Sequence, residues 1–152
     1  MITVKQGLTT CAMIVGSYKL GCEILKSAKK VDNRVKKLCS DLIELNPGLN
    51  DRDIRFRGHD STRPYGCTTP DPSIAYAYAM KNHSPTLTGL TLKPGCKPND
   101  IYESVVHVNK NQVDQQAVVP VTKDELTIAD GAYLMYLRQS MTVSNKGFTS
   151  GI

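Results

Sequence analysis

Apolar residues recur every three or four positions in the first third of the chain, a spacing typical of one face of an α-helix. The clearest run covers residues 31–45, where charged residues occupy the opposite face. Its apolar stripe consists of Val31, Val35, Leu38, Leu42 and Leu45. Asn46-Pro47-Gly48 ends this helix. A less regular run over residues 12–29 predicts another helix, and we expect the two to form an antiparallel pair packed on the rest.

After residue 50 the pattern changes to short segments rich in β-branched residues, which predict strands. These segments cover residues 54–57, 65–69, 87–92, 101–108 and 117–121. We expect the first strand to end at Gly58. Between the second and third strands, Asp71 can cap a helix that begins at Pro72 and continues to about Asn82. Asp130-Gly131, between two apolar segments at 126–128 and 133–137, predicts the turn of a hairpin.

Helices followed by short strands with one internal helix predict the α+β class, with an antiparallel or mixed sheet. A chain of 152 residues of which 40% are hydrophobic is the size of a single domain. We divide it into N-terminal helices at 1–49, a β-rich core at 50–139 and a polar, frayed tail at 140–152, and we expect residues 1–10 to be loose. Lys19 and Glu23 interrupt the one candidate membrane segment, residues 8–25, so no membrane partner is expected.

The formal net charge is +5, and basic residues crowd residues 26–37. These are Lys26, Lys29, Lys30, Arg34, Lys36 and Lys37. We interpret them as a solvated helix face, with an acidic partner or an anionic cofactor as alternatives. Nucleic acid is a weaker alternative because aromatic and basic residues do not interleave.

The cysteines and histidines do not form a recognisable metal or disulfide pattern. Five cysteines are widely spaced and none forms a C-x-x-C pair, so we expect free thiols in a reducing compartment. They are Cys11, Cys22, Cys39, Cys67 and Cys96. His59, His83 and His107 fall on three different predicted elements and give no metal-ligand spacing. Walker loops, glycine-rich dinucleotide fingerprints and nucleophile elbows are absent from the sequence.

The stretch 55–76 carries the most chemical information. Arg57 near the end of a strand, followed by Gly58, places a fixed cation beside bare backbone, an arrangement that suits a dinucleotide. Thr68 and Thr69 precede a predicted helix N-terminus, which favours phosphate oxygens. The alternative is a strand with alternating charge and a capped turn.

Phe56-Arg57-Gly58, followed by Gly66-Cys67-Thr68-Thr69 and an Ala/Tyr-rich helix, resembles the first two motifs of arginine-dependent ADP-ribosyltransferases. The short interval between the motifs is similar to that of the HopF and EspJ group of type III secreted effectors. The resemblance covers about residues 51–121. It implies an ADP-ribosyltransferase-like core, NAD as the cofactor, secretion into the cytosol of a target cell, and a secretion chaperone as a further partner.

The resemblance also implies residue roles. Arg57 clamps the diphosphate or the nicotinamide ribose, Gly58 binds the carboxamide, and Thr68 or Thr69 orients neighbouring groups. Asp114, ahead of an apolar strand, stabilises the positive charge that develops as the nicotinamide–ribose bond breaks.

Other assignments stay open at this point. Tyr76, Tyr65 or Tyr78 stacks on the nicotinamide or packs in the core. The family's Glu-x-Glu motif is missing, and Gln116 stands where its catalytic glutamate falls.

Three further acids compete with Asp114 for the catalytic position: Glu103, Asp124 and Glu125. The expected function is an NAD-dependent mono-ADP-ribosyltransferase, a monomer that modifies a target-cell protein. The alternatives are an NAD glycohydrolase, an inactive binding module and a nucleic-acid binder.

Overall fold

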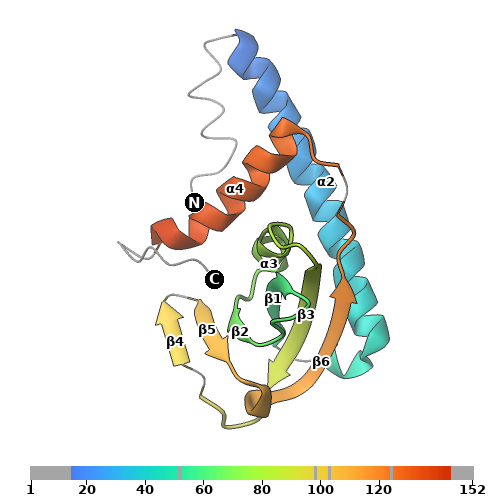
Figure 1. The fold of residues 1–152 in the computed structure, drawn as a ribbon, viewed down its shortest axis with the longest axis vertical. Helices are drawn as coiled ribbons and strands as arrows, with labels where there is room; N and C mark the ends of the chain where they lie inside the picture. Colours follow the sequence, from blue (N-terminus) through green and yellow to red (C-terminus); the bar gives the residue numbers. More distant parts are fainter. Residues whose placement is uncertain (1–14, 51–52, 98, 103, 124, 145–152) are drawn as a thin grey trace.

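The computed structural model describes residues 15–50, 53–97, 99–102, 104–123 and 125–144. This part of the chain contains three α-helices and two antiparallel sheets of three strands each (Figure 1), so the α+β prediction is confirmed. No helix within it is both long and apolar enough to cross a membrane. The expectations for residues 1–10 and for the last part of the tail, 145–152, lie outside the described residues.

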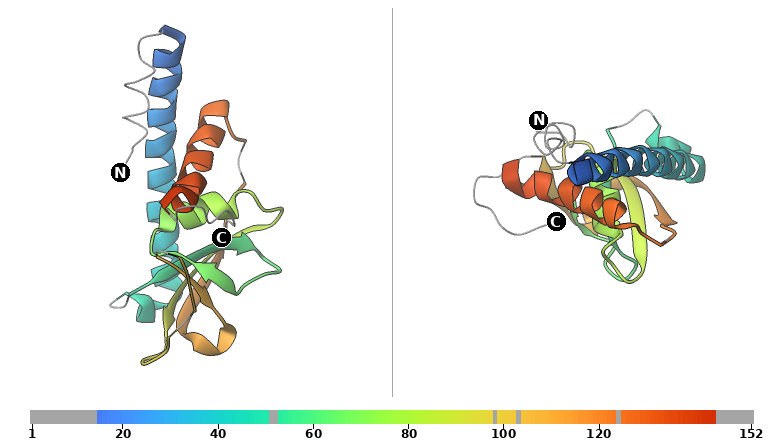
Figure 2. Two further views of the ribbon diagram at one scale, coloured as in Figure 1. Left: turned by 90° about the vertical axis from the view of Figure 1, so that its left-hand side faces the viewer. Right: turned by 90° about the horizontal axis from the view of Figure 1, so that it is seen from above.

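Helix α2 (Val15–Leu45) is continuous, so the prediction of two N-terminal helices is wrong. The expected break near residue 30 contains no glycine or proline, and its lysines and alanine favour a helix. Thirty-one residues make a rod of about 46 Å. Its C-terminal half packs on the core through Val31, Val35 and Leu42, while its N-terminal half extends beyond the sheets (Figure 2).

Strands β1 (Arg55–Asp60), β3 (Pro85–Leu92) and β6 (Val113–Pro120) form the first sheet in the order β1-β3-β6. The prediction that Gly58 ends β1 is wrong. Glycine is needed there because helix α3 (Pro72–Ala79) approaches closely, and an added Cβ would lie 1.6 Å from the Ala75 carbonyl oxygen. Helix α3 begins as predicted, with the Asp71 carboxylate accepting a hydrogen bond from Ser73 N at 2.9 Å.

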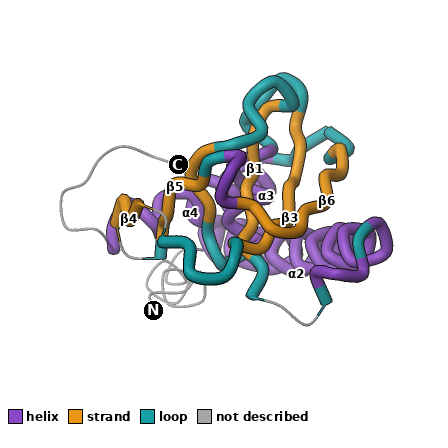
Figure 3. The backbone as a smooth tube through the Cα atoms, turned by 90° about the horizontal axis from the view of Figure 1, so that it is seen from below, coloured by secondary structure: helices purple, strands orange, loops and turns teal. Residues whose placement is uncertain are grey.

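The second sheet has the order β2-β5-β4, from β2 (Gly66–Thr68), β5 (Val105–Val108) and β4 (Asn99–Tyr102). The predicted single strand over residues 101–108 is therefore wrong. The chain turns at Ser104, whose φ of 65° is incompatible with a continuous strand. Seen from below, β5 and β4 lie beyond β1, on the side away from β6 (Figure 3).

Helix α4 (Ile128–Ser144) occupies the place of the predicted hairpin and includes the first five residues of the predicted tail, so both expectations are wrong there. Thr127 N donates to the Asp130 carboxylate and Asp130 N donates to Thr127 Oγ1, each at 3.0 Å, which is a capping box. The same carboxylate accepts hydrogen bonds from Ser27 Oγ at 2.6 Å and Lys30 Nζ at 2.7 Å. These contacts attach α4 to α2.

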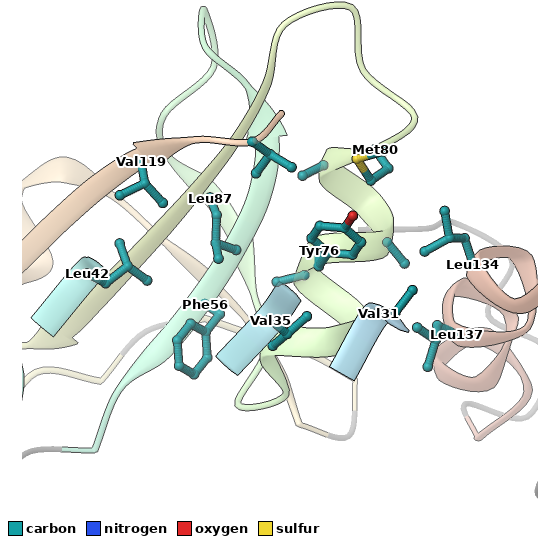
Figure 4. Close-up of a cluster of buried hydrophobic side chains, with 14 of the residues drawn as sticks. Val31, Val35, Leu42, Phe56, Tyr76, Met80, Leu87, Val119, Leu134 and Leu137 are labelled. Carbon is teal, nitrogen blue, oxygen red and sulfur yellow. The ribbon is translucent and has the colours of Figure 1, made fainter. Parts of the chain in front are cut away.

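The main core lies between the first sheet and the three helices (Figure 4). Its largest fully buried side chains include Tyr76 of α3, Leu42 of α2 and Leu87 of β3. A smaller cluster of Ile74, Tyr78 and Val105 joins α3 to β5. Helix α3 is thus packed against both sheets, and it fixes the position of one sheet relative to the other.

Candidate functional site

The two sheets meet where β1 passes β2. Phe56 and Thr69 exchange two backbone hydrogen bonds, at 2.7 and 2.8 Å, in an isolated bridge. Beyond this bridge, arginine side chains rather than backbone groups connect the two strands. We name this region the β1–β2 seam, and it consists of Arg55, Arg57, Arg63, Cys67 and Thr68.

Arg57 lies at the centre of the seam and is half-buried. Its Nε and Nη2 donate to the Arg63 carbonyl oxygen at 3.2 and 2.9 Å, and its Nη1 donates to the Cys67 carbonyl oxygen at 3.2 Å. A guanidinium has five N–H donors, so two of them have no acceptor among the described residues. The side chain therefore has a fixed position and unused capacity to bind an anion.

Gly66 makes room for this guanidinium. Its φ is +152°, and an added Cβ would lie 2.7 Å from Arg57 Nη1 and 2.9 Å from Cζ. A side chain at this position would displace the planar group, so a glycine precedes Cys67 for a steric reason.

The loop between β1 and β2 presents the Arg63 carbonyl to Arg57. Asp60 holds this loop, because its carboxylate accepts hydrogen bonds from Thr62 Oγ1 at 2.7 Å, Thr62 N at 3.1 Å and Ser84 N at 2.9 Å. These bonds, led by the one from the Thr62 hydroxyl, lower the pKa of Asp60 to about 2. The carboxylate is therefore ionised at neutral pH and the loop stays fixed.

The seam is cationic. Burial lowers the pKa of Arg57, the Cys67 thiol acts in the opposite direction, and the nearby Arg63 lowers it further. Arginine nevertheless stays protonated at neutral pH. Burial raises the pKa of Cys67, with Arg57 only partly offsetting it, so this thiol is protonated and is a poor nucleophile. The seam thus offers cations without an activated thiolate.

Arg55 and Thr68 complete the seam. Arg55 Nε donates to Thr68 Oγ1 at 2.8 Å, and Arg55 Nη2 donates to the Thr68 carbonyl oxygen at 3.1 Å. The Thr68 hydroxyl in turn donates to the Val106 carbonyl oxygen at 3.1 Å. Thr69 Oγ1 accepts from Asp71 N at 3.1 Å. Both hydroxyls, predicted to orient a ligand, are buried and engaged within the protein, and they hold Arg55 and the start of α3.

Sequence reasoning missed Arg55 and Arg63. The signal for Arg55 was its spacing of two residues from Arg57, which places both side chains on one face of a strand. Arg63 contributes its backbone carbonyl, a role that no pattern of side chains in the sequence predicts.

The structure does not bring Asp114 next to Arg57. Arg57 pairs with Thr88 of β3, which pairs with Val118 of β6. Asp114 lies four residues further along β6. With a rise of about 3.3 Å per residue and about 4.8 Å between strands, the two Cα atoms are about 16 Å apart. Strand alternation places Arg57 on the face of the first sheet that points away from α3, whereas the register shift between Leu90 and Leu92 interrupts the alternation in β6 before Asp114.

Gln116 lies closer to the seam than Asp114. It is exposed and belongs to the row that joins Arg55, Leu90 and Gln116 across the three strands. The row therefore ends in an amide and not in a carboxylate. Glu103 and Asp124, two of the competing acids, lie outside the described residues, and Glu125 is exposed in the segment before α4.

Two of the three predicted tyrosines, Tyr76 and Tyr78, lie apart from Arg57. Tyr76 is 2% exposed, and its hydroxyl accepts a hydrogen bond from Arg34 of α2 at 3.4 Å. Tyr78 is buried and donates to the Arg138 carbonyl oxygen at 3.3 Å. Tyr65 is half-buried in the loop next to the seam. Of the three, Tyr65 alone lies in the loop that Arg57 contacts.

His59, two residues beyond Arg57 on β1, is buried and neutral. Burial lowers the pKa of His59, the backbone contact with Asp60 raises it, and the charge of Arg57 lowers it again. Its Nδ1 donates to the Asp60 carbonyl oxygen at 2.6 Å, and the Thr88 hydroxyl donates to its Nε2 at 2.8 Å. Within the described residues, histidines, cysteines and carboxylates form no group of three that could hold a metal ion.

A hollow of about 790 Å³ borders the seam at Arg55. Asp53, Phe56, Pro70 and Thr91 are among the other residues that line it. Its volume falls within the range of sites that bind drug-sized ligands. Arg57 does not line this hollow, so a ligand that used both would extend along β1.

Comparison with known proteins finds no matching family model, no similar curated protein and no similar solved structure. Functional inference therefore depends on the seam and on the sequence motifs that produce it.

Four of the six basic residues at 26–37 of α2 are exposed, while Lys30 and Arg34 are half-buried. At least four of the six are ion-paired within the chain, at N–O distances from 2.7 to 3.4 Å. The pairs are Lys26–Glu23, Lys30–Asp130, Lys36–Asp32 and Lys37–Asp41. Pairing reduces the positive potential that a nucleic acid or an acidic protein would meet on this helix.

Proposed function

We propose that the chain binds NAD at the β1–β2 seam and acts as an NAD-dependent mono-ADP-ribosyltransferase on a protein of a target cell. The observation that supports the proposal is the half-buried Arg57 guanidinium, which has two N–H donors left over after its bonds to the Arg63 and Cys67 carbonyls. A partly desolvated cation with two remaining N–H donors favours a phosphate, which it can bind through two hydrogen bonds.

In this proposal, different parts of the first sheet bind different parts of NAD. Arg57 holds the diphosphate, and the hollow beside Arg55 accepts one end of the dinucleotide. Asp114 lies on β6, two strands away from Arg57, where a dinucleotide anchored at Arg57 and extended across β3 would bring its nicotinamide ribose. Its carboxylate stabilises positive charge at ribose C1′ through its position.

Bound NAD supplies an activated glycosidic bond. An acceptor side chain attacks C1′, nicotinamide leaves with the bonding electron pair, and the acceptor releases its proton to solvent. In the hydrolytic variant, water takes the place of the acceptor.

One observation favours a second candidate, an NAD-binding module without turnover. Gln116, not an acid, occupies the row that crosses the sheet from Arg55, and an amide cannot supply the charge of a carboxylate.

Calorimetric titration with NAD, combined with labelling of a target-cell lysate by labelled NAD, tests both candidates. Arg57→Lys keeps the positive charge but loses the planar guanidinium that can donate two hydrogen bonds to one phosphate. We expect about tenfold weaker NAD binding. Asp114→Asn should bind NAD as the native protein does and lose the labelling. Lys36→Gln, on the solvated face of α2, is the matched control and should change neither.

The outcomes separate the candidates. Binding and labelling that both depend on Arg57 support the transferase. Binding without labelling or nicotinamide release supports the inactive module. Labelling by a folded Arg57→Ala protein equal to that of the native protein would reject the proposed site.

A further inference from the structure

A second hollow, of about 340 Å³, lies between α2, α3 and the chain just after β6. Arg34, Lys37 and Leu38 of α2, Tyr76 of α3, and Val121 line it. Helix α3 covers the core face of β1, opposite to the face from which Arg57 projects. This hollow is therefore separate from the β1–β2 seam, and nothing inferred about it depends on NAD binding.

The Tyr76 hydroxyl is the buried polar group of this hollow. Arg34, which also lines the hollow, donates to it from Nη1 at 3.4 Å, so the hydroxyl end of the ring faces this side. A phenol can donate one hydrogen bond as well as accept. The Tyr76 O–H has no acceptor among the described residues, although the side chain is 2% exposed. A buried donor in this situation calls for an acceptor from outside the protein.

The charges around the hydroxyl indicate the sign and the magnitude of the charge on that acceptor. Arg34 and Lys37 are cationic, and Asp41, which also lines the hollow, binds Lys37 at 3.4 Å. The three side chains together carry one net positive charge. This balance suits a monoanion better than a doubly charged phosphate ester, which Asp41 would repel.

The remaining walls are apolar. Leu38, Pro120 and Val121 line the hollow on the side of β6 and α2. A ligand with an apolar body can therefore bury that body here while its anionic end reaches Tyr76 and Arg34.

We propose that this hollow binds a small organic carboxylate. One carboxylate oxygen accepts the Tyr76 O–H hydrogen bond, Arg34 and Lys37 balance the charge, and the apolar part packs on Leu38 and Val121. The mode of recognition is a buried hydroxyl with a cation beside it and apolar side chains in the remaining walls.

Titration of the amide NMR spectrum of the full chain with sodium benzoate tests the proposal. We expect saturable shifts centred on Leu38, Val121 and Thr122. Tyr76→Phe removes the hydroxyl and keeps the ring, and it should weaken benzoate binding about tenfold. Tyr136→Phe is the matched control, since Tyr136 stacks on Tyr133 in α4 and does not line the hollow. It should leave the affinity unchanged.

Further arms keep the test decisive. Arg34→Gln should weaken benzoate by a similar factor, which covers the case in which Tyr76→Phe alters the fold. Benzyl alcohol, the neutral analogue, should bind more weakly than benzoate. NAD binding should be the same in Tyr76→Phe and in the native protein. Absence of saturable shifts, equal affinity of Tyr76→Phe and native protein, or equal binding of benzoate and benzyl alcohol would each overturn the proposal.

Discussion

Gly66→Ala tests how the seam is built. The new Cβ would lie 2.7 Å from Arg57 Nη1 and 2.9 Å from Cζ, closer than these atoms can approach, so the guanidinium must move. Movement breaks its bond to the Cys67 carbonyl oxygen, because Nη1 is the donor of that bond. The substitution therefore disorganises the seam without removing any of its arginines.

The magnitude follows from two contributions. Positive φ at a residue with a side chain costs about 1–3 kcal/mol. A lost hydrogen bond from a charged donor costs about 1.5–3 kcal/mol, and less where the group is partly exposed, as Arg57 is. We expect Gly66→Ala to lower the free energy of unfolding by about 3 kcal/mol, which corresponds to a drop in Tm of about 6–12 °C.

Gly95→Ala is the matched control. Gly95 also has a positive φ, +76°, but an added Cβ would meet no atom within 4 Å. Its cost should be the backbone contribution alone, about 1 kcal/mol. The difference between the two variants in urea unfolding measures the contact with Arg57. Equal losses of stability, or unchanged NAD affinity in Gly66→Ala, would refute the view that Gly66 positions the guanidinium.

Three further predictions concern the rest of the chain. Asp130→Asn should lower the free energy of unfolding by about 2 kcal/mol, because it removes the counter-charge of Lys30, whose side chain is 39% exposed. Burial alone would raise the pKa of Asp130, but its hydrogen bonds together hold that pKa well below the ordinary value. Its contribution is therefore complete above about pH 5 and is lost as the pH falls below about 4, so urea unfolding of the variant should depend less on acid pH. Equal pH dependence of the unfolding free energy in Asp130→Asn and in the native protein would contradict this. Burial raises the pKa of Cys39 and Cys67, and mass spectrometry at pH 7 should show both reacting with iodoacetamide more slowly than Cys96, whereas equal rates would disagree. Gly58→Ala should give no folded protein by circular dichroism, since its Cβ would lie 1.6 Å from a carbonyl oxygen of α3, and a native spectrum would disprove the close approach.

Elements with local signals were predictable from the sequence. The Asp71-Pro72 cap placed the start of α3, and β-branched runs placed most of β3 and the second half of β6. The prediction of a helix boundary near residue 30 was wrong, because a weaker apolar pattern before that residue does not mark a separate helix. Residues with high helix propensity continue through this region, so the helix continues as well.

The region of α4 shows a conflict between two local signals. Asp130-Gly131 is typical of a hairpin turn, while Thr127 and Asp130 are spaced as a capping box. Hydrogen bonds from Ser27 and Lys30, about a hundred residues earlier in the chain, favour the helix. A contact at such sequence separation cannot be derived from the neighbouring residues alone.

The candidate site was predictable only where it depends on local motifs. Arg57 and Thr68 were both assigned to the NAD site, and the seam contains both. The position of Asp114 depends on the register of β6 against β3, which shifts between Leu90 and Leu92. The sequence pattern contains no information about that irregularity.

A crystal structure of the chain soaked with NAD tests the central claim most directly. We predict diphosphate oxygens about 2.7–3.2 Å from Nη1 and Nη2 of Arg57, with the dinucleotide running along β1 beside Arg55. NAD bound elsewhere, with Arg57 still contacting only the carbonyls of Arg63 and Cys67, would contradict the account.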